Sequence, residues 1–122
     1  MKNKEFSKHL EVRTKGFAVQ VIRLSSGLPL MSEAKVVRNQ ITKSGTSIGA
    51  NYREANRARS KADSANKIRI CESEANETLY WLEIISDLNW IESTKISFVM
   101  DEANELLALF TSIGNKLRSP KL

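Results

Sequence analysis

Residues 40–69 read QITKSGTSIGANYREANRARSKADSANKIR, and the rest of the chain is organised around this stretch. It combines small residues at helical spacing with a dense set of basic residues. Between residues 35 and 69, nine basic residues stand against two acidic ones, whereas from residue 70 onward nine acidic residues stand against four basic ones. The charge is therefore divided along the chain, and the segment is a candidate site for an anionic partner.

The spacing of apolar residues predicts four helices. These residues recur at steps of three, four or seven, which is the period of one helix face. Signals that stop or cap a helix separate the four segments, at Gly27-Leu28-Pro29, at Ser32, at Ser60 with Asp63, and at Ser93 or Thr94. We therefore expect helices over residues 4–26, 32–58, 61–88 and 94–117.

Three of these helices carry one apolar stripe each. The stripe residues are Phe6, Leu10, Phe17, Val21, Leu24 and Leu28 in the first; Val37, Ile41, Ser44, Ile48, Asn51 and Ala55 in the second; and Ile96, Met100, Ala103, Leu107, Phe110, Ile113 or Gly114, and Leu117 in the fourth. Four amphipathic helices with short connections and no strand pattern predict an all-α, antiparallel up-down four-helix bundle. The length of 122 residues fits a single domain spanning 1–122.

The helix over residues 61–88 differs because it is apolar on two sides. One stripe contains Ile68, Cys71, Ala75, Leu79 and Leu82, and a nearly opposite one contains Ile70, Trp81, Ile84 and Leu88. A helix of a solitary bundle does not need the second stripe, so we expect it to contact another copy of the chain.

Two glycines in the helix over residues 32–58 point to close packing. Gly45 and Gly49 lie on one flank near Tyr52, and together they cost the helix about 2 kcal/mol in propensity, which a close neighbour must offset. That neighbour is either another helix of the same chain or another subunit. The candidate interface residues are Gly45, Gly49, Tyr52, Trp81, Ile84 and Leu88.

The basic residues allow more than one interpretation. Charge on the outer face of a bundle often serves only solubility, and Arg53 and Arg57 also have acidic candidates for ion pairs in Glu74 and Glu77. Against this, the cluster is rich in arginine, whose planar guanidinium binds phosphate with two parallel hydrogen bonds. The candidate nucleic-acid-binding residues are Lys43, Arg53, Arg57, Arg59, Lys61 and Lys67.

Several functions lack the residues they require. The segment 44–49, SGTSIG, does not have the Gly-x4-Gly-Lys-Ser/Thr spacing of a nucleotide-binding loop. His9 is the single histidine, and it belongs to no Glu-x-x-His pair of a di-iron bundle. We therefore expect no catalytic residue, metal, cofactor or small-molecule substrate. A lone Cys71, no apolar signal sequence and no apolar run of about 20 residues predict a cytoplasmic protein that does not enter a membrane.

Nearly the whole chain resembles one bacterial family. The resemblance rests on Phe17-Ala18-Val19, Leu28-Pro29, the block SGTSIGANYREA at 44–55, RARSKAD at 57–63, Lys67 and ETLYWL at 77–82. The family is the four-helix-bundle group named for proteins encoded in intervening sequences of 23S ribosomal RNA genes. Ser64 departs from the pattern, because an aromatic residue is expected there.

The resemblance implies a four-helix bundle that assembles into a ring, typically a homopentamer, with no established enzymatic activity. It also implies a more distant kinship with the accessory protein of diversity-generating retroelements, which works with a reverse transcriptase and RNA. RNA is therefore an expected partner beside other copies of the chain. The family name reflects gene location and does not identify the RNA that is bound.

Overall fold

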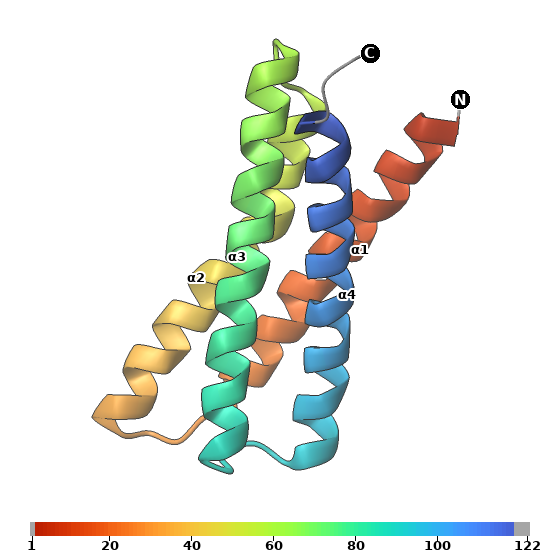
Figure 1. The fold of residues 1–122 in the computed structure, drawn as a ribbon. Coiled ribbons are helices and arrows are strands. Elements are labelled where there is room, and N and C mark those ends of the chain that lie inside the picture. The colour runs from red at the N-terminus through yellow and green to blue at the C-terminus, as the bar shows by residue number, and fades with distance from the viewer. Residues whose placement is uncertain (1, 119–122) are drawn as a thin grey trace.

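The computed structural model describes residues 2–118, with side chains from residue 4 to residue 117. Within this range the chain forms four helices and no strand: α1 (Lys2–Ser25), α2 (Ser32–Asn56), α3 (Lys61–Asp87) and α4 (Ser93–Arg118). Short turns join them, and consecutive helices run in opposite directions (Figure 1). The predicted all-α four-helix bundle is confirmed, with helix ends within two residues of those expected.

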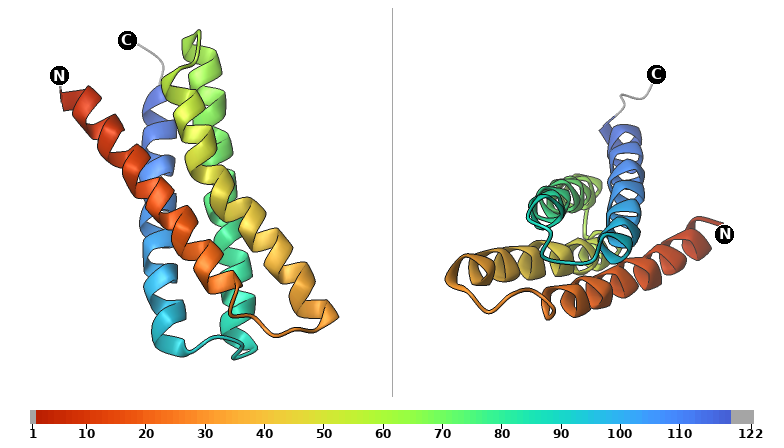
Figure 2. Two further views of the ribbon diagram at one scale, coloured as in Figure 1. Left: turned by 180° about the vertical axis from the view of Figure 1, so that it is seen from behind. Right: turned by 90° about the horizontal axis from the view of Figure 1, so that it is seen from below.

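The four helices lie in two layers. α1 and α2 form one layer that leans across a second layer made by α3 and α4 (Figure 2). Among neighbouring helices, α2 packs most extensively on α3, and α1 packs least on α4. The N-terminal turns of α1 stand away from α4 (Figure 1). The bundle is therefore tight along α2 and α3 and more open between α1 and α4.

The core draws on all four helices. Its largest fully buried apolar side chains are Phe17, Val21, Ile41, Ile48, Leu82, Ile85, Leu106 and Phe110. Phe110 meets the ring of Tyr52 edge to face, with 5.5 Å between the ring centroids. Two buried hydroxyls are also paired, because the Thr78 hydroxyl donates to the Ser44 hydroxyl at 2.9 Å. This hydrogen bond satisfies polar groups where α3 crosses α2.

The glycines of α2 let α1 approach closely. A Cβ atom at Gly45 would lie 2.8 Å from Val21 Cγ1, and one at Gly49 would lie 3.1 Å from Thr14 Oγ1. Thr14 is itself buried, and its hydroxyl donates to the Leu10 carbonyl at 2.9 Å. Both glycines thus pack against a helix of the same chain, which is the first of the two alternatives left open by the sequence.

Several predicted stripe positions need correction. Phe6 is 48 % exposed, because the N-terminal turns of α1 stand away from α4. In α2, Tyr52 is buried while Asn51 is only partly covered. In α4, Val99 and Leu106 are core residues, whereas Met100 and Leu107 lie at the edge of the core. In each case the residue found in the core lies one position or one helical turn from the predicted one.

Two of the predicted helix caps also differ. α2 begins at Ser32, and its capping position is Met31, which supplies no side-chain hydrogen bond. α4 begins at Ser93, with the Ile96 amide bonded to the Glu92 carbonyl. The cap of α3 is as expected, because the Ser60 hydroxyl accepts from the Asp63 amide at 3.0 Å.

Charged side chains join neighbouring helices at several places, two of which hold α1. The Arg13 guanidinium binds Glu102 of α4 at 2.6 and 2.8 Å and Glu105 at 2.5 Å. These bonds to Glu102 and Glu105 raise the pKa of Arg13 above its ordinary value. Arg38 of α2 donates to the carbonyl of Ser25, the last residue of α1, and to the carbonyls of Leu28 and Pro29 in the turn that follows. The first contact bridges the more open side between α1 and α4, and the second holds the end of α1 against α2.

Candidate nucleic-acid interface

The tight turn between α2 and α3 gathers basic side chains at one end of the bundle. α2 ends at Asn56, where the Arg57 amide bonds back to the carbonyls of the last helical turn, and α3 begins at Lys61 after the Ser60 cap. Arg53 lies on the last turn of α2, while Arg57 and Arg59 lie on the connection. Because the turn is short, residues on both helices reach the same surface.

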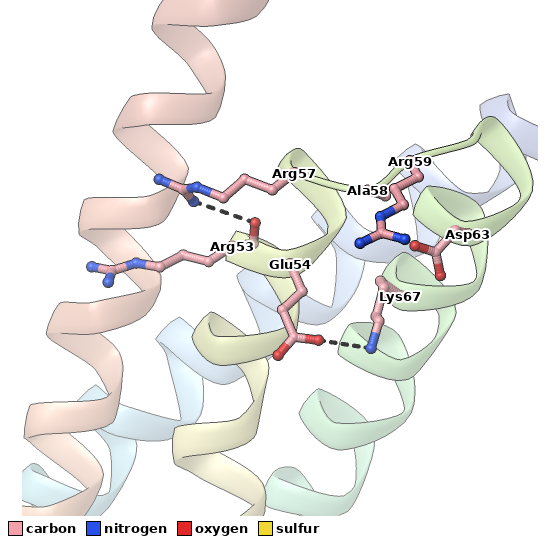
Figure 3. A pocket seen from close by; sticks show the side chains of 7 residues that line it. All are labelled: Arg53, Glu54, Arg57, Ala58, Arg59, Asp63 and Lys67. Atoms are coloured by element: carbon pink, nitrogen blue, oxygen red, sulfur yellow. Dashed lines mark hydrogen bonds and ion pairs between the residues drawn. The ribbon is translucent and has the colours of Figure 1, made fainter.

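A hollow of about 480 Å³ lies at this end, which we call the basic hollow. Its lining residues are Arg53, Glu54, Arg57, Ala58, Arg59, Asp63 and Lys67 (Figure 3). Figure 3 shows Arg53 and Arg57 extending side by side toward α1, while Arg59 and Lys67 lie over α3. Four of the six predicted basic candidates are therefore brought together, along with two carboxylates.

The other two candidates lie outside the hollow. Lys61 is exposed at the first residue of α3. Lys43 is exposed on α2, ten residues before Arg53, which corresponds to about 15 Å along a helix axis. The charge of Lys43 acts instead on Glu74 of α3, whose pKa it lowers against the raising effects of burial and Glu77. The six residues thus form one cluster of four, one close neighbour in Lys61, and one separate lysine.

Lys67 is already paired within the chain. Its Nζ lies 2.7 Å from Glu54 Oε1 (Figure 3). The hydrogen bond to Glu54 raises the pKa of Lys67, so the amine stays charged while its charge is offset. Lys67 therefore contributes less to an anion site than the arginines do.

Arg53 and Arg57 have an acidic neighbour that the sequence did not indicate. Glu11 of α1 lies 3.9 Å from Arg53 Nε and 3.9 Å from Arg57 Nη1, and it accepts a hydrogen bond from Asn56 at 2.9 Å. A separation of 3.9 Å is too long for a direct hydrogen bond. The side chains of Arg53 and Arg57 remain 55 % and 71 % exposed. Both guanidiniums therefore keep most of their donors available to a ligand.

Ion pairs of these arginines with Glu74 or Glu77, which the sequence left open as an alternative, are absent among the described residues. Glu77 accepts the Trp81 indole N–H at 3.1 Å. Burial raises the pKa of Glu74, Glu77 raises it further, and the charge of Lys43 lowers it. The acids of α3 thus serve other partners, and Glu11, more than 40 residues earlier, takes their place. Only the three-dimensional packing of α1 on α2 brings Glu11 to this surface.

The six candidate interface residues divide into two groups. Gly45 and Gly49 face α1, and Tyr52 is 3 % exposed in the core, so the chain's own packing occupies them. Trp81 and Ile84 are half-buried on α3, and Leu88 is 51 % exposed just after it. The second group is the one that leaves apolar surface uncovered.

Cys71 and His9, the residues whose types most often serve in catalysis or metal binding, lie apart from the basic hollow and in unreactive surroundings. Cys71 is buried, its thiol donates to the Ile48 carbonyl, and burial raises its pKa to about 12. His9 lies exposed on α1. Across the described residues there is no group of three or more His, Cys, Asp or Glu side chains that could hold a metal ion. None of the four described helices is long and apolar enough to cross a bilayer.

Comparison with known proteins identifies the family. The family described as 23S rRNA-intervening sequence protein matches residues 8–112, which is most of the chain and all of the turn that carries the basic hollow. The chain belongs to this family. A solved structure agrees: a protein of unknown function from the S23 ribosomal protein family of Bacteroides thetaiotaomicron VPI-5482 has 38 % identity and a TM-score of 0.80, covering 89 % of this chain and 97 % of its own. No curated protein matches the chain.

Membership in the 23S rRNA-intervening sequence family establishes the fold and leaves the role open. The family description states no ligand and no reaction. The solved relative is itself of unknown function. The surface of this family member carries the basic hollow at one end and a partly uncovered apolar side on α3.

Proposed function

We propose that this protein is a non-enzymatic, ring-forming four-helix bundle that binds the backbone of RNA or another nucleic acid through the basic hollow. The observation that carries the proposal is the pair of guanidiniums on Arg53 and Arg57, which lie side by side and largely exposed. Guanidinium binds phosphate oxygens through parallel hydrogen bonds, and Arg59 adds a third such group in the same hollow.

The composition of the hollow favours binding to phosphates and not to bases. Its seven lining residues include three arginines and one lysine and no aromatic side chain on which a base could stack. Contacts of this kind depend strongly on salt and little on sequence. The predicted partner is therefore a structured nucleic acid recognised by the spacing of its phosphates.

Carboxylates in and beside the hollow lower its charge without blocking it. Glu11 lies 3.9 Å from each of two arginines, so an incoming phosphate can replace it without breaking a short hydrogen bond. Glu54 holds Lys67 more firmly, at 2.7 Å. The arginines are thus the residues expected to carry the affinity.

Assembly is the second part of the proposal. Trp81, Ile84 and Leu88 leave an apolar strip on α3 that the bundle does not cover completely. Joining copies through this strip would remove it from water and would place several basic hollows in one particle. Linked sites bind one polymer more tightly than isolated ones, because each further contact becomes intramolecular. A homopentameric ring in the cytoplasm is the form we propose.

A structural or protein-interaction oligomer is the alternative. In it the basic residues would form ion pairs within or between subunits, as Lys67 does with Glu54. Arg53 and Arg57 do form ion pairs with Glu11, but these are long, at 3.9 Å, and leave the two side chains 55 % and 71 % exposed, which favours nucleic-acid binding over this alternative.

Removing Arg53 and Arg57 tests the proposal. The double variant R53A/R57A is expected to bind a structured RNA hairpin roughly 10- to 50-fold more weakly than the wild type near physiological salt, because two phosphate contacts are lost. Filter binding measures the affinity. The control is K8A/K35A, which removes two exposed positive charges away from the hollow and should change affinity little. Equal weakening by both pairs would mean that net charge alone binds the RNA, which contradicts the proposal.

A further inference from the structure

Two apolar surfaces lie on different sides of the bundle, and neither is part of the basic hollow. The first is the α3 face, which consists of Trp81, Ile84 and Leu88. Trp81 and Ile84 are half-buried, Leu88 is 51 % exposed, and the neighbouring Tyr80 is 56 % exposed. Trp81 and Leu88 are seven residues apart, so they stack two turns apart along one side of the helix. The α3 face is thus a continuous apolar strip.

The second surface is the α1–α4 groove, lined by Gln20, Arg23, Leu24, Gly27, Ile91, Glu92, Thr94, Lys95, Phe98 and Val99. It encloses about 530 Å³ where the last turns of α1 meet the first turns of α4. Phe98 at its edge is 65 % exposed, although it is a large apolar residue. α1 and α4, which border the groove, are also the neighbouring helices that pack least extensively on each other. The groove is a concave apolar site that the chain leaves unfilled.

The two surfaces differ in charge. Between residues 70 and 88, α3 and the residue after it contain five acidic residues and no basic one. One of them, Glu77, holds the indole N–H of Trp81 on the α3 face at 3.1 Å. The groove is bordered by Arg23 and Lys95, with Glu92 as its single acid. The carboxylate of Glu77 on the α3 face and the two basic residues at the border of the groove are complementary in charge, which favours association of the two surfaces.

The groove also contains a polar atom without a partner. Among the described residues, the side-chain oxygen of Gln20 is buried and has no hydrogen-bond donor. A buried acceptor in this state is unfavourable until a donor reaches it. The α3 face offers such a donor in the indole N–H of Trp81, which now bonds to an exposed carboxylate. The unpaired oxygen of Gln20 in the groove and the indole N–H of Trp81 on the α3 face are therefore a matching acceptor and donor.

We infer that the α3 face of one copy docks into the α1–α4 groove of the next copy. This inference rests on the self-association in the proposed function and names the two surfaces that make it. Because the surfaces lie on different helices, the contact is head to tail, and an open assembly always keeps one free groove at one end and one free face at the other. Such contacts extend until the rotation between copies closes a ring.

Two variants with one blocked surface each test the inference. Phe98→Arg blocks the groove, and Leu88→Arg blocks the α3 face; both residues are exposed, so the bundle should fold normally, which circular dichroism verifies. Each variant alone is expected to be monomeric by sedimentation at a concentration that fully assembles the wild type. Mixed in equal amounts, they should form a 1:1 dimer and nothing larger, because one intact groove meets one intact face. The control Val12→Arg, at an exposed apolar site on α1, should assemble like the wild type.

The other outcomes separate this inference from the proposed assembly itself. A wild-type chain that stays monomeric contradicts both. If the wild type assembles and Phe98→Arg assembles equally well, self-association stands and the groove is not its site, which leaves the groove to an apolar ligand or another protein. If each variant is monomeric but the mixture forms no dimer, the two surfaces do not meet each other. The inference is overturned in each of these cases.

Discussion

Phe110→Ala is expected to lower the free energy of unfolding by about 3–5 kcal/mol, which is a large share of the roughly 5–15 kcal/mol available to a domain. Phe110 is fully buried and packs edge to face on Tyr52, so the truncation leaves a cavity between α2 and α4. Urea unfolding followed by circular dichroism measures the loss. In a chain of this length the melting temperature should fall by about 10–20 °C.

Phe6→Ala is the matched control for this change. Phe6 is 48 % exposed on α1, so the same truncation removes little buried surface and should cost less than about 1 kcal/mol. Similar losses for the two variants would show that the core does not centre on Phe110. They would also show that the N-terminal turns of α1 are covered in solution.

Gly45→Ala is expected to destabilise the protein by about 1–3 kcal/mol, although alanine favours a helix by about 1 kcal/mol over glycine. The new methyl group would lie 2.8 Å from Val21 Cγ1 and 3.0 Å from Val21 Cβ. Val21 is fully buried and cannot turn away without disturbing the core. Steric overlap should therefore outweigh the gain in helix propensity, as urea unfolding will measure.

Two further variants isolate the contact between α1 and α2. Gly16→Ala places a methyl group where no other atom lies within 4 Å, so it should stabilise the protein by about 0.5–1 kcal/mol. In V21A/G45A the overlap is relieved, and the double variant should lose less stability than the two single changes together. If Gly45→Ala stabilises the chain as Gly16→Ala does, then α1 does not approach α2 at this point.

The number and limits of the helices could be predicted because local signals determine them. Ser60 with Asp63 marked the start of α3 within one residue, and Gly27 with Pro29 marked the end of α1. Which neighbour faces the core was less predictable. A uniform turn of 100° per residue favoured Asn51 over Tyr52, and Met100 over Val99. The layers lean across each other, so the buried side of each helix rotates along its length, and a single period does not follow this rotation (Figure 2).

The candidate site was predictable in its residues and less so in its geometry. The density of arginine indicated the basic surface, and the α2–α3 turn gathers Arg53, Arg57 and Arg59 as expected. The separation of Lys43 from the other basic candidates, and the position of Glu11 beside Arg53 and Arg57, depend on how the helices pack, and α1 lies across α2 in a way that no short-range pattern encodes. The glycine flank was correctly interpreted as a site of close approach, while its partner among the helices had to come from the structure.

The decisive measurement is the affinity of the wild-type protein for a structured RNA across a series of salt concentrations. Three or four phosphate contacts in the basic hollow predict a slope of log K against log salt of about −2.7 to −3.6, so binding should weaken roughly 40- to 150-fold between 50 and 200 mM salt. An affinity that does not change with salt, or no binding at the lowest salt, would contradict the claim that the basic hollow binds a nucleic-acid backbone.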